Sequence, residues 1–72
     1  MRLRAKVFAR DFHSCQLCAR DGVQSAADQV DHIIPLSLGG SNEMGNLQSL
    51  CIDCHKLKTA REAKLRAPPR GG

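Results

Sequence analysis

Residues 15–18 read CQLC and residues 51–54 read CIDC, and these two short stretches constrain how the rest of the chain can fold. Two CxxC pairs are typical of a four-cysteine zinc site or, in small secreted domains, of two disulfides. Residues 1–12 are charged throughout and lack the apolar segment of a secretory signal, which favours a reducing compartment. We therefore predict a cytoplasmic protein with a structural Zn²⁺ ion held by Cys15, Cys18, Cys51 and Cys54.

The chain is short and offers little material for a hydrophobic core. Phe8 and Phe12 are the only aromatic side chains among its 72 residues. Domains below roughly 70–80 residues usually need a disulfide or a metal in addition to burial. No run approaches the roughly 18 apolar residues of a membrane span, so no membrane association is expected. We expect a single domain over residues 1–67 and a flexible tail over residues 68–72, which begins at Pro68-Pro69.

The hydrophobic pattern predicts a small α+β domain in which the CxxC pairs bracket a hairpin. An apolar stripe from Leu3 to Phe12 has helical spacing, and a second helical pattern follows Cys54. A simple zinc ribbon has about 15–20 residues between its CxxC pairs. Here 32 residues separate Cys18 from Cys51, so the metal would clamp the ends of an insert. The expected elements are helices over 2–12 and 53–66, strands over Val30–Pro35 and Leu47–Leu50, and loops over 19–29 and 36–45.

The insert and the residue after it carry polar groups in a particular order. Asp31-His32 lies in the first predicted strand, Gly39-Gly40 in the loop, Asn46-Leu47 before the second strand, and His55 directly after Cys54. With the CxxC pairs, this set resembles the HNH endonuclease family of His-Me finger, or ββα-metal, nucleases over roughly residues 13–60. The resemblance implies a ββα-metal core: a β-hairpin with a long loop, then a helix, preceded by an N-terminal helix and clamped by the four-cysteine zinc site.

The resemblance also implies roles for individual residues. His32 would be the general base that activates water, since histidine titrates near neutrality. Asp31 and His55 would hold one catalytic divalent metal, with positions left open for a phosphate oxygen and the leaving oxygen. Mg²⁺ or Mn²⁺ is expected there, and Ni²⁺ or Co²⁺ would also suit mixed oxygen and nitrogen ligands. Asn46 would hydrogen-bond across the loop and fix the backbone around His32.

Several of these residues have alternative interpretations. Neighbours on a regular strand point to opposite faces, so placing Asp31 and His32 in one site would require a bulge or sharp twist. His55 could instead compete for the structural zinc, although four cysteines already complete a tetrahedral site. Asn46 could be a purely structural loop residue. His13 has no matching role in the family and is taken as incidental.

The formal charge of +4 suits a polyanionic partner without establishing one. Lys56, Lys58 and Arg61 on the last predicted helix are candidate DNA contacts, or equally an ordinary solvated face. Glu62 and Arg66 have the i,i+4 spacing of a helix-surface pair.

The motif set predicts a metal-dependent endonuclease that nicks or cuts DNA, with double-stranded DNA as its expected substrate. Such a short HNH chain resembles those of phages and prophages. Because nothing here resembles a sequence reader, we expect either weak sequence specificity or a partner, such as a phage packaging component or a fused specificity domain. The alternatives are a zinc-stabilised module that binds nucleic acid or protein without cutting, and a purely structural zinc domain. The joint presence of Asp31, His32, Asn46 and His55 favours the enzyme, since binding alone would not require a base beside a metal ligand.

Overall fold

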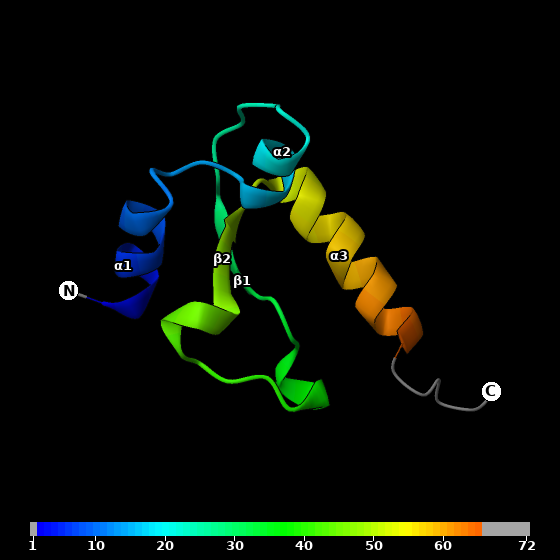
Figure 1. Cartoon of the computed structure of the whole chain (residues 1–72). Coiled ribbons are helices and arrows are strands. Elements are labelled where there is room, and N and C mark those ends of the chain that lie inside the picture. Colours follow the sequence, from blue (N-terminus) through cyan, green and yellow to red (C-terminus); the bar gives the residue numbers. More distant parts are fainter. Residues whose placement is uncertain (1, 66–72) are drawn as a thin grey trace.

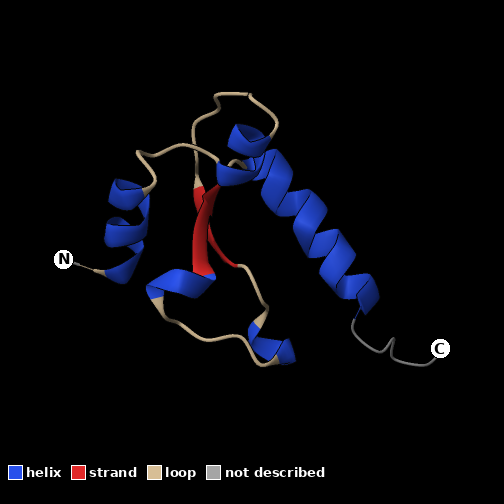
Figure 2. Cartoon of the chain, in the orientation of Figure 1, coloured by secondary structure: helices blue, strands red, loops and turns tan. Residues whose placement is uncertain are grey.

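The computed structural model describes residues 2–65, and its core is a two-stranded hairpin between helices (Figure 1). Figure 2 shows the two strands in red, with helix α1 on one side and helix α3 on the other. The elements are α1 (Leu3–Arg10), α2 (Gln16–Arg20), β1 (Gln29–His32), the 3-10 turns η1 (Leu36–Leu38) and η2 (Met44–Asn46), β2 (Leu47–Leu50) and α3 (Ile52–Leu65). This is the α+β arrangement predicted from the sequence, with the hairpin between the two CxxC pairs.

The strands pair antiparallel and one to one, from Gln29 opposite Leu50 to His32 opposite Leu47. Of the two devices considered for placing Asp31 and His32 in one site, a bulge or a sharp twist, the bulge is therefore absent from this strand pair. The first strand also ends at His32, three residues before the predicted end. The strand pairing stops there because the backbone N–H and carbonyl oxygen of Ile34 are hydrogen-bonded to the side-chain amide of Asn46 instead of to a partner strand.

The loop between the strands is not irregular throughout, since η1 and η2 both lie within or at the end of it. Gly39 follows η1 with φ of 90°, a left-handed conformation that glycine adopts without steric cost. Gly40 packs so closely on Ile34 that an added Cβ would lie 1.7 Å from the carbonyl oxygen of Ile34. The glycine pair therefore allows a tight turn, and this turn brings residues 41–46 back to the end of β1.

Helix α1 ends at Arg10, two residues earlier than predicted, and a polar pair rather than an apolar stripe attaches it to the hairpin. Asp11 is buried, accepts two hydrogen bonds from the Arg10 guanidinium at 2.8 and 3.0 Å, and accepts a third from the Ser49 backbone N–H at 3.0 Å. Arg10 also donates to the carbonyl oxygens of Met44 and Leu47. The chain then turns at Phe12, whose backbone has a left-handed conformation with φ of 55°. Phe12 is 86% exposed, so it does not contribute to the core with the other residues of the predicted apolar stripe.

The fully buried core is small and centres on the cysteines. Cys15, Leu50 and Cys51 form a cluster against which Leu17, Cys18 and Cys54 pack. Val7 is the one buried residue of α1. Residues 16–20 form a helix in place of the start of the predicted loop, because Cys15 caps them: its sulfur accepts the N–H of Cys18 at 3.5 Å. Burial is thus concentrated where the sequence predicted a metal.

The helices of residues 2–65 include none that is long and apolar enough to cross a membrane. Helix α3 begins at Ile52, one residue before the predicted start, and Leu65 is the last described residue. The predicted end of the domain at residue 67, the predicted tail over residues 68–72 and the pairing of Glu62 with Arg66 lie outside the described residues.

Candidate active site and metal centre

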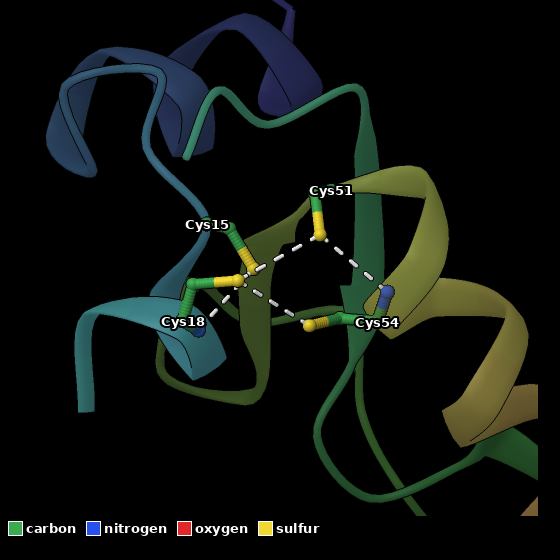
Figure 3. A group of neighbouring side chains, drawn as sticks. All are labelled: Cys15, Cys18, Cys51 and Cys54. Atoms are coloured by element: carbon green, nitrogen blue, oxygen red, sulfur yellow. Dashed lines mark hydrogen bonds between the residues drawn. The ribbon is translucent and has the colours of Figure 1, made fainter. Parts of the chain in front are cut away.

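The four cysteines converge at the junction of α2, β2 and α3, as Figure 3 shows. Their sulfur atoms all lie within 4.8 Å of one another, with Cys18 at 3.8 Å from Cys51 and at 3.6 Å from Cys54. Tetrahedral zinc–sulfur bonds of about 2.3 Å place sulfurs about 3.8 Å apart, whereas a disulfide requires about 2.05 Å. All four are free thiols, so the alternative of two disulfides is not what this structure contains. The cluster is close enough to bind one metal ion.

Both CxxC pairs use the same local geometry. The sulfur of the first cysteine accepts the N–H of the second, at 3.5 Å in Cys15–Cys18 and at 3.5 Å in Cys51–Cys54. In each pair the second cysteine lies in the first turn of a helix, α2 or α3. An N–H group directed at sulfur favours the thiolate, which is the form that binds a metal.

The thiol pKa values reflect this crowding. Burial by itself would raise the pKa of Cys15, but the N–H groups of Cys18 and Cys51 lower it to about 7. The pKa of Cys54 is raised, chiefly because its thiol is hydrogen-bonded with Cys51 and then Cys18, and the pKa of Cys18 is raised mainly by its bond with Cys15. The Cys15 thiolate therefore forms more readily than those of Cys18 and Cys54, whose protons a bound cation would displace.

Asp31 and His55 approach each other across the hairpin and α3. The Nε2 atom of His55 lies 4.0 Å from Oδ1 of Asp31, a carboxylate whose side chain is only 10% exposed. Bonds of about 2.1 Å in octahedral geometry place neighbouring ligand atoms about 3.0 Å apart, so the two side chains would have to approach by about 1 Å to share one ion. As a donor set, a hard oxygen and an imidazole nitrogen fit a small divalent cation with most of its coordination positions open.

His32 is the last paired residue of β1, and its ring turns to the loop. Its Nε2 atom lies 2.7 Å from Oδ1 of Asn42. Among the described residues, no hydrogen bond or ion pair joins the ring of His32 to Asp31 or to His55. The structure thus brings the side chains of Asp31 and His55 together. His32 follows Asp31 in the sequence, but its ring contacts Asn42 instead of either of them. Sequence reasoning did not identify Asn42, because a single loop asparagine carries no pattern.

Asn46 closes the base of the loop. Its side-chain oxygen accepts the N–H of Ile34 at 2.9 Å, and its amide nitrogen donates to the carbonyl oxygens of Ile34 at 3.0 Å and Ser41 at 2.7 Å. The backbone of Asn46 accepts the N–H of Ile33 at 2.8 Å. These bonds cross the loop to the segment that follows His32, and they are structural contacts whatever further role Asn46 has.

The cationic side chains of α3 have different environments. Lys56 and Arg61 are exposed, whereas the side chain of Lys58 is only 16% exposed. The Lys58 ammonium lies 2.8 Å from Oδ2 of Asp31, donates to the His32 carbonyl oxygen at 2.7 Å and pairs with Glu62. Glu62 therefore pairs with Lys58. The sequence contained this i,i+4 spacing, but nothing in it indicated that Asp31 is the third member.

Comparisons with known proteins agree with this geometry. The family model described as HNH endonuclease matches residues 15–61. The DNA annealing helicase and endonuclease ZRANB3 is 54% identical over 43 residues in Homo sapiens and 51% in Bos taurus. Each match covers 58% of this chain but only 4% of the relative's length.

A solved structure resembles nearly the whole chain. The HNH endonuclease of the deep-sea thermophilic bacteriophage GVE2, crystallised with a manganese ion, superposes with a TM-score of 0.84 and 40% sequence identity. The similarity covers 92% of this chain and 74% of that one. The two chains share one fold over nearly the whole of this chain, and this chain belongs to the HNH endonuclease family.

Proposed function

We propose that this chain is a metal-dependent endonuclease that hydrolyses phosphodiester bonds of DNA by nicking or cutting, and that it is of the phage or prophage type. The observation that carries the proposal is the approach of the His55 ring to the buried Asp31 carboxylate, next in the chain to His32. An acidic oxygen and an imidazole beside a second histidine provide a cation site and a base together. The bacteriophage origin of the GVE2 nuclease supports the phage assignment.

Two different metals fit the two sites. Four thiolates suit Zn²⁺, which would serve structure because its coordination is complete. Asp31 and His55 suit Mg²⁺ or Mn²⁺, and their mixed donor set would also accept Ni²⁺ or Co²⁺. The manganese ion of the GVE2 nuclease supports a divalent cation here. When bound, that cation neutralises charge on the phosphate and assists departure of the 3′ oxygen.

His32 is the proposed general base, and its contact with Asn42 indicates which ring atom acts. A side-chain amide oxygen only accepts hydrogen bonds, so Nε2 of neutral His32 carries the proton that it donates to Asn42. The lone pair is then on Nδ1, which is the atom that would take a proton from the attacking water. Asn46 would keep this geometry by fixing the backbone at Ile34.

Double-stranded DNA is the proposed substrate, with Lys56 and Arg61 as phosphate contacts. His55, Lys58 and Glu62 share one face of α3, and at 100° per residue Arg61 lies about 90° to one side of the centre of that face and Lys56 about 130° to the other. Both are exposed, and Arg61 is the better placed of the two to contact a backbone that passes over the site. Lys58 was also a candidate contact, but its ammonium is bound to Asp31 and Glu62.

Sequence specificity would come from elsewhere, such as a fused domain or a phage packaging component. In ZRANB3 the matching segment is a small part of a much longer protein, which supports an HNH unit working beside other domains. The competing function is a zinc-stabilised module that binds nucleic acid or protein without cutting. The Asp31–His55 approach favours the enzyme, because a binding module gains nothing from an inward-facing pair of ligands.

The deciding experiment is cleavage of supercoiled plasmid by zinc-loaded protein with EDTA, Mg²⁺, Mn²⁺ or Ni²⁺. We expect nicked or linear DNA with metal and none with EDTA, at an EDTA concentration that leaves the zinc content and circular dichroism of the protein unchanged. His32→Ala should abolish cleavage while zinc content and circular dichroism stay unchanged. His13→Asn is the matched control, since it removes a histidine ring outside the site at a left-handed position that asparagine tolerates. Equal cleavage by wild type and His32→Ala would contradict the mechanism, and DNA binding without cleavage would favour the binding module.

A further inference from the structure

Lys58 is enclosed in a way that a surface lysine of a helix is not. Its side chain is 16% exposed, and its ammonium contacts Oδ2 of Asp31 at 2.8 Å, the carbonyl oxygen of His32 at 2.7 Å and the carboxylate of Glu62. A lysine ammonium has three N–H donors and no acceptor, so three oxygens satisfy it completely. An ordinary i,i+4 pair on a helix surface has no third partner and contributes little. This lysine is held in place within the candidate active site.

The contact with Asp31 involves the carboxylate proposed to bind the catalytic cation. Oδ1 of Asp31 is directed at His55, 4.0 Å away, while Oδ2 is directed at Lys58, with Gln48 Nε2 at 3.5 Å. One oxygen of the carboxylate thus faces the second proposed ligand, and the other is paired with a resident positive charge. A divalent cation bound between Asp31 and His55 would therefore bind to the Asp31 carboxylate while its negative charge is partly neutralised by Lys58.

The charges around this carboxylate do not cancel, because of Glu62. Asp31 and Lys58 sum to zero, and Glu62 brings the group to a net charge of −1. The side chain of Glu62 is 21% exposed and lies one helical turn beyond Lys58, so it reaches Asp31 only through the shared ammonium. Charges that are mostly withdrawn from water interact more strongly than exposed ones. The affinity of oxygen-rich sites for divalent cations depends on how many ligand charges remain available.

We infer that Lys58 and Glu62 form a charge pair that sets the divalent-cation affinity of the Asp31–His55 site, with Lys58 opposing the cation and Glu62 offsetting Lys58. This inference rests on the proposed function only in taking Asp31 and His55 as the cation site. Glu62 is a positioning residue here: it touches neither cation nor DNA, and it acts by drawing the ammonium's charge away from Asp31.

The test is a Mn²⁺ titration of zinc-loaded protein without DNA, following free Mn²⁺ by electron paramagnetic resonance. Glu62→Gln brings the local charge to 0 and should weaken Mn²⁺ binding by about 10-fold or more. Lys58→Met brings it to −2 and should tighten binding by a similar factor. The double variant returns the charge to −1, and its Kd should lie within about 3-fold of wild type, because the two effects act on one carboxylate.

Two further variants make the outcomes distinguishable. Glu43→Gln is the matched control, since Glu43 is exposed and its carboxylate forms no ion pair within residues 2–65. It should leave the Kd unchanged. Asp31→Asn should abolish Mn²⁺ binding at this site. If Asp31→Asn abolishes binding but Glu62→Gln and Lys58→Met both match wild type, the charge-pair inference alone is overturned.

Other results would also decide the matter. Weaker binding by Lys58→Met would overturn the inference, since the ammonium would then be ordering Asp31 for the cation. Wild-type affinity in Asp31→Asn would show that the cation binds elsewhere, and would overturn both the inference and the proposed metal ligands. Circular dichroism and zinc content report folding. The inference predicts a higher Kd for Mn²⁺ in Glu62→Gln and a lower Kd in Lys58→Met. If only one of the two variants folds, its Kd alone still tests the inference.

Discussion

At the scale of single residues, His32 depends on its hydrogen bond with Asn42. A neutral histidine ring has one N–H and one lone pair, and its hydrogen-bond partners determine which nitrogen carries which. In the neutral ring, the contact with Asn42 Oδ1 at 2.7 Å favours the tautomer with its proton on Nε2, and it orients the ring. Without that contact both tautomers and several ring orientations would become accessible, and only some of them would present the proposed base to water.

We therefore predict that Asn42→Ala lowers the cleavage rate by about 10- to 100-fold, the usual effect of losing a residue that orients a functional histidine. The protein should keep its zinc and its thermal stability, because Asn42 is exposed. Asn42→Asp provides the comparison, since a carboxylate still accepts from Nε2 and should retain more activity than alanine. The measurement is plasmid nicking under single-turnover conditions. Unchanged cleavage by Asn42→Ala would mean that His32 is oriented by other means.

Residue-level prediction from the sequence worked where a motif has a fixed spacing and failed where a contact is tertiary. The CxxC pairs and the glycine turn were identifiable because their chemistry is local. Asn42 and the pairing of Lys58 with Asp31 were not, because each joins segments at least 10 residues apart in the chain. The roles of His32, Asn46 and His55 stay predictions, since the geometry places these residues without testing them.

At the scale of elements, α1 is held by a polar contact more than by apolar packing. Val7 is its one buried residue, while Arg10 and Asp11 supply hydrogen bonds to three points on β2 and η2. Burial alone would raise the pKa of Asp11, but bonds from Arg10 and Ser49 outweigh it and hold the pKa below the ordinary value. The ionised carboxylate is thus part of the folded structure.

Asp11→Asn should lower the free energy of unfolding at pH 7 by about 1–3 kcal/mol, since it weakens the bonds to Arg10 and Ser49. Because the pKa of Asp11 is lower in the folded state, its ionised carboxylate stabilises the fold at pH values above the ordinary pKa, near 3.9. This stabilisation is lost as the pH falls through the folded-state pKa. The difference in the free energy of unfolding between wild type and Asp11→Asn should therefore become smaller in acid. Urea unfolding with excess zinc at several pH values measures this. Asp28→Asn, at an exposed aspartate, is the control. A gap that widens in acid would contradict the assignment.

Element boundaries were predictable to within a few residues, and the misses have physical causes. The second strand was placed correctly at Leu47–Leu50. The first strand was placed too late because its apolar residues, Ile33 and Ile34, suggested pairing that the Asn46 side chain replaces. Helix α1 ended early because Asp11 bonds to the sheet and the chain turns at Phe12. In each case a long-range polar contact overrode a local apolar pattern.

At the scale of the whole molecule, the cluster of four cysteines forms much of the core. Cys15 and Cys51 are buried beside Leu50, and little other apolar material is fully enclosed. Binding of structural zinc by thiolates is worth about 10–16 kcal/mol, which is comparable to the entire stability of a typical domain. Folding and metal binding should therefore be one process.

We predict that stripping zinc with a strong chelator abolishes most of the helical circular dichroism, and that adding zinc restores it. Dialysis against metal-free buffer is the control, because it should remove a weakly held catalytic cation while the thiolates retain zinc. Cleavage should then return on adding Mg²⁺ or Mn²⁺ alone. A zinc-free protein that keeps its helical signal would show that the small core suffices without the metal.

The position of His55 directly after Cys54 has a consequence for how this chain can change during evolution. Cys54 fixes the rotational phase of α3 at the cysteine cluster, and His55 and Lys58 face Asp31 only in that phase. One residue inserted or deleted between Cys54 and His55 would rotate everything beyond it by about 100°. The hairpin loop can change length without such a rotation. Among functional descendants of this sequence, insertions and deletions should therefore be absent from residues 51–62, and between residues 36 and 45 they should occur only where the contacts of Gly40 and Asn42 are kept.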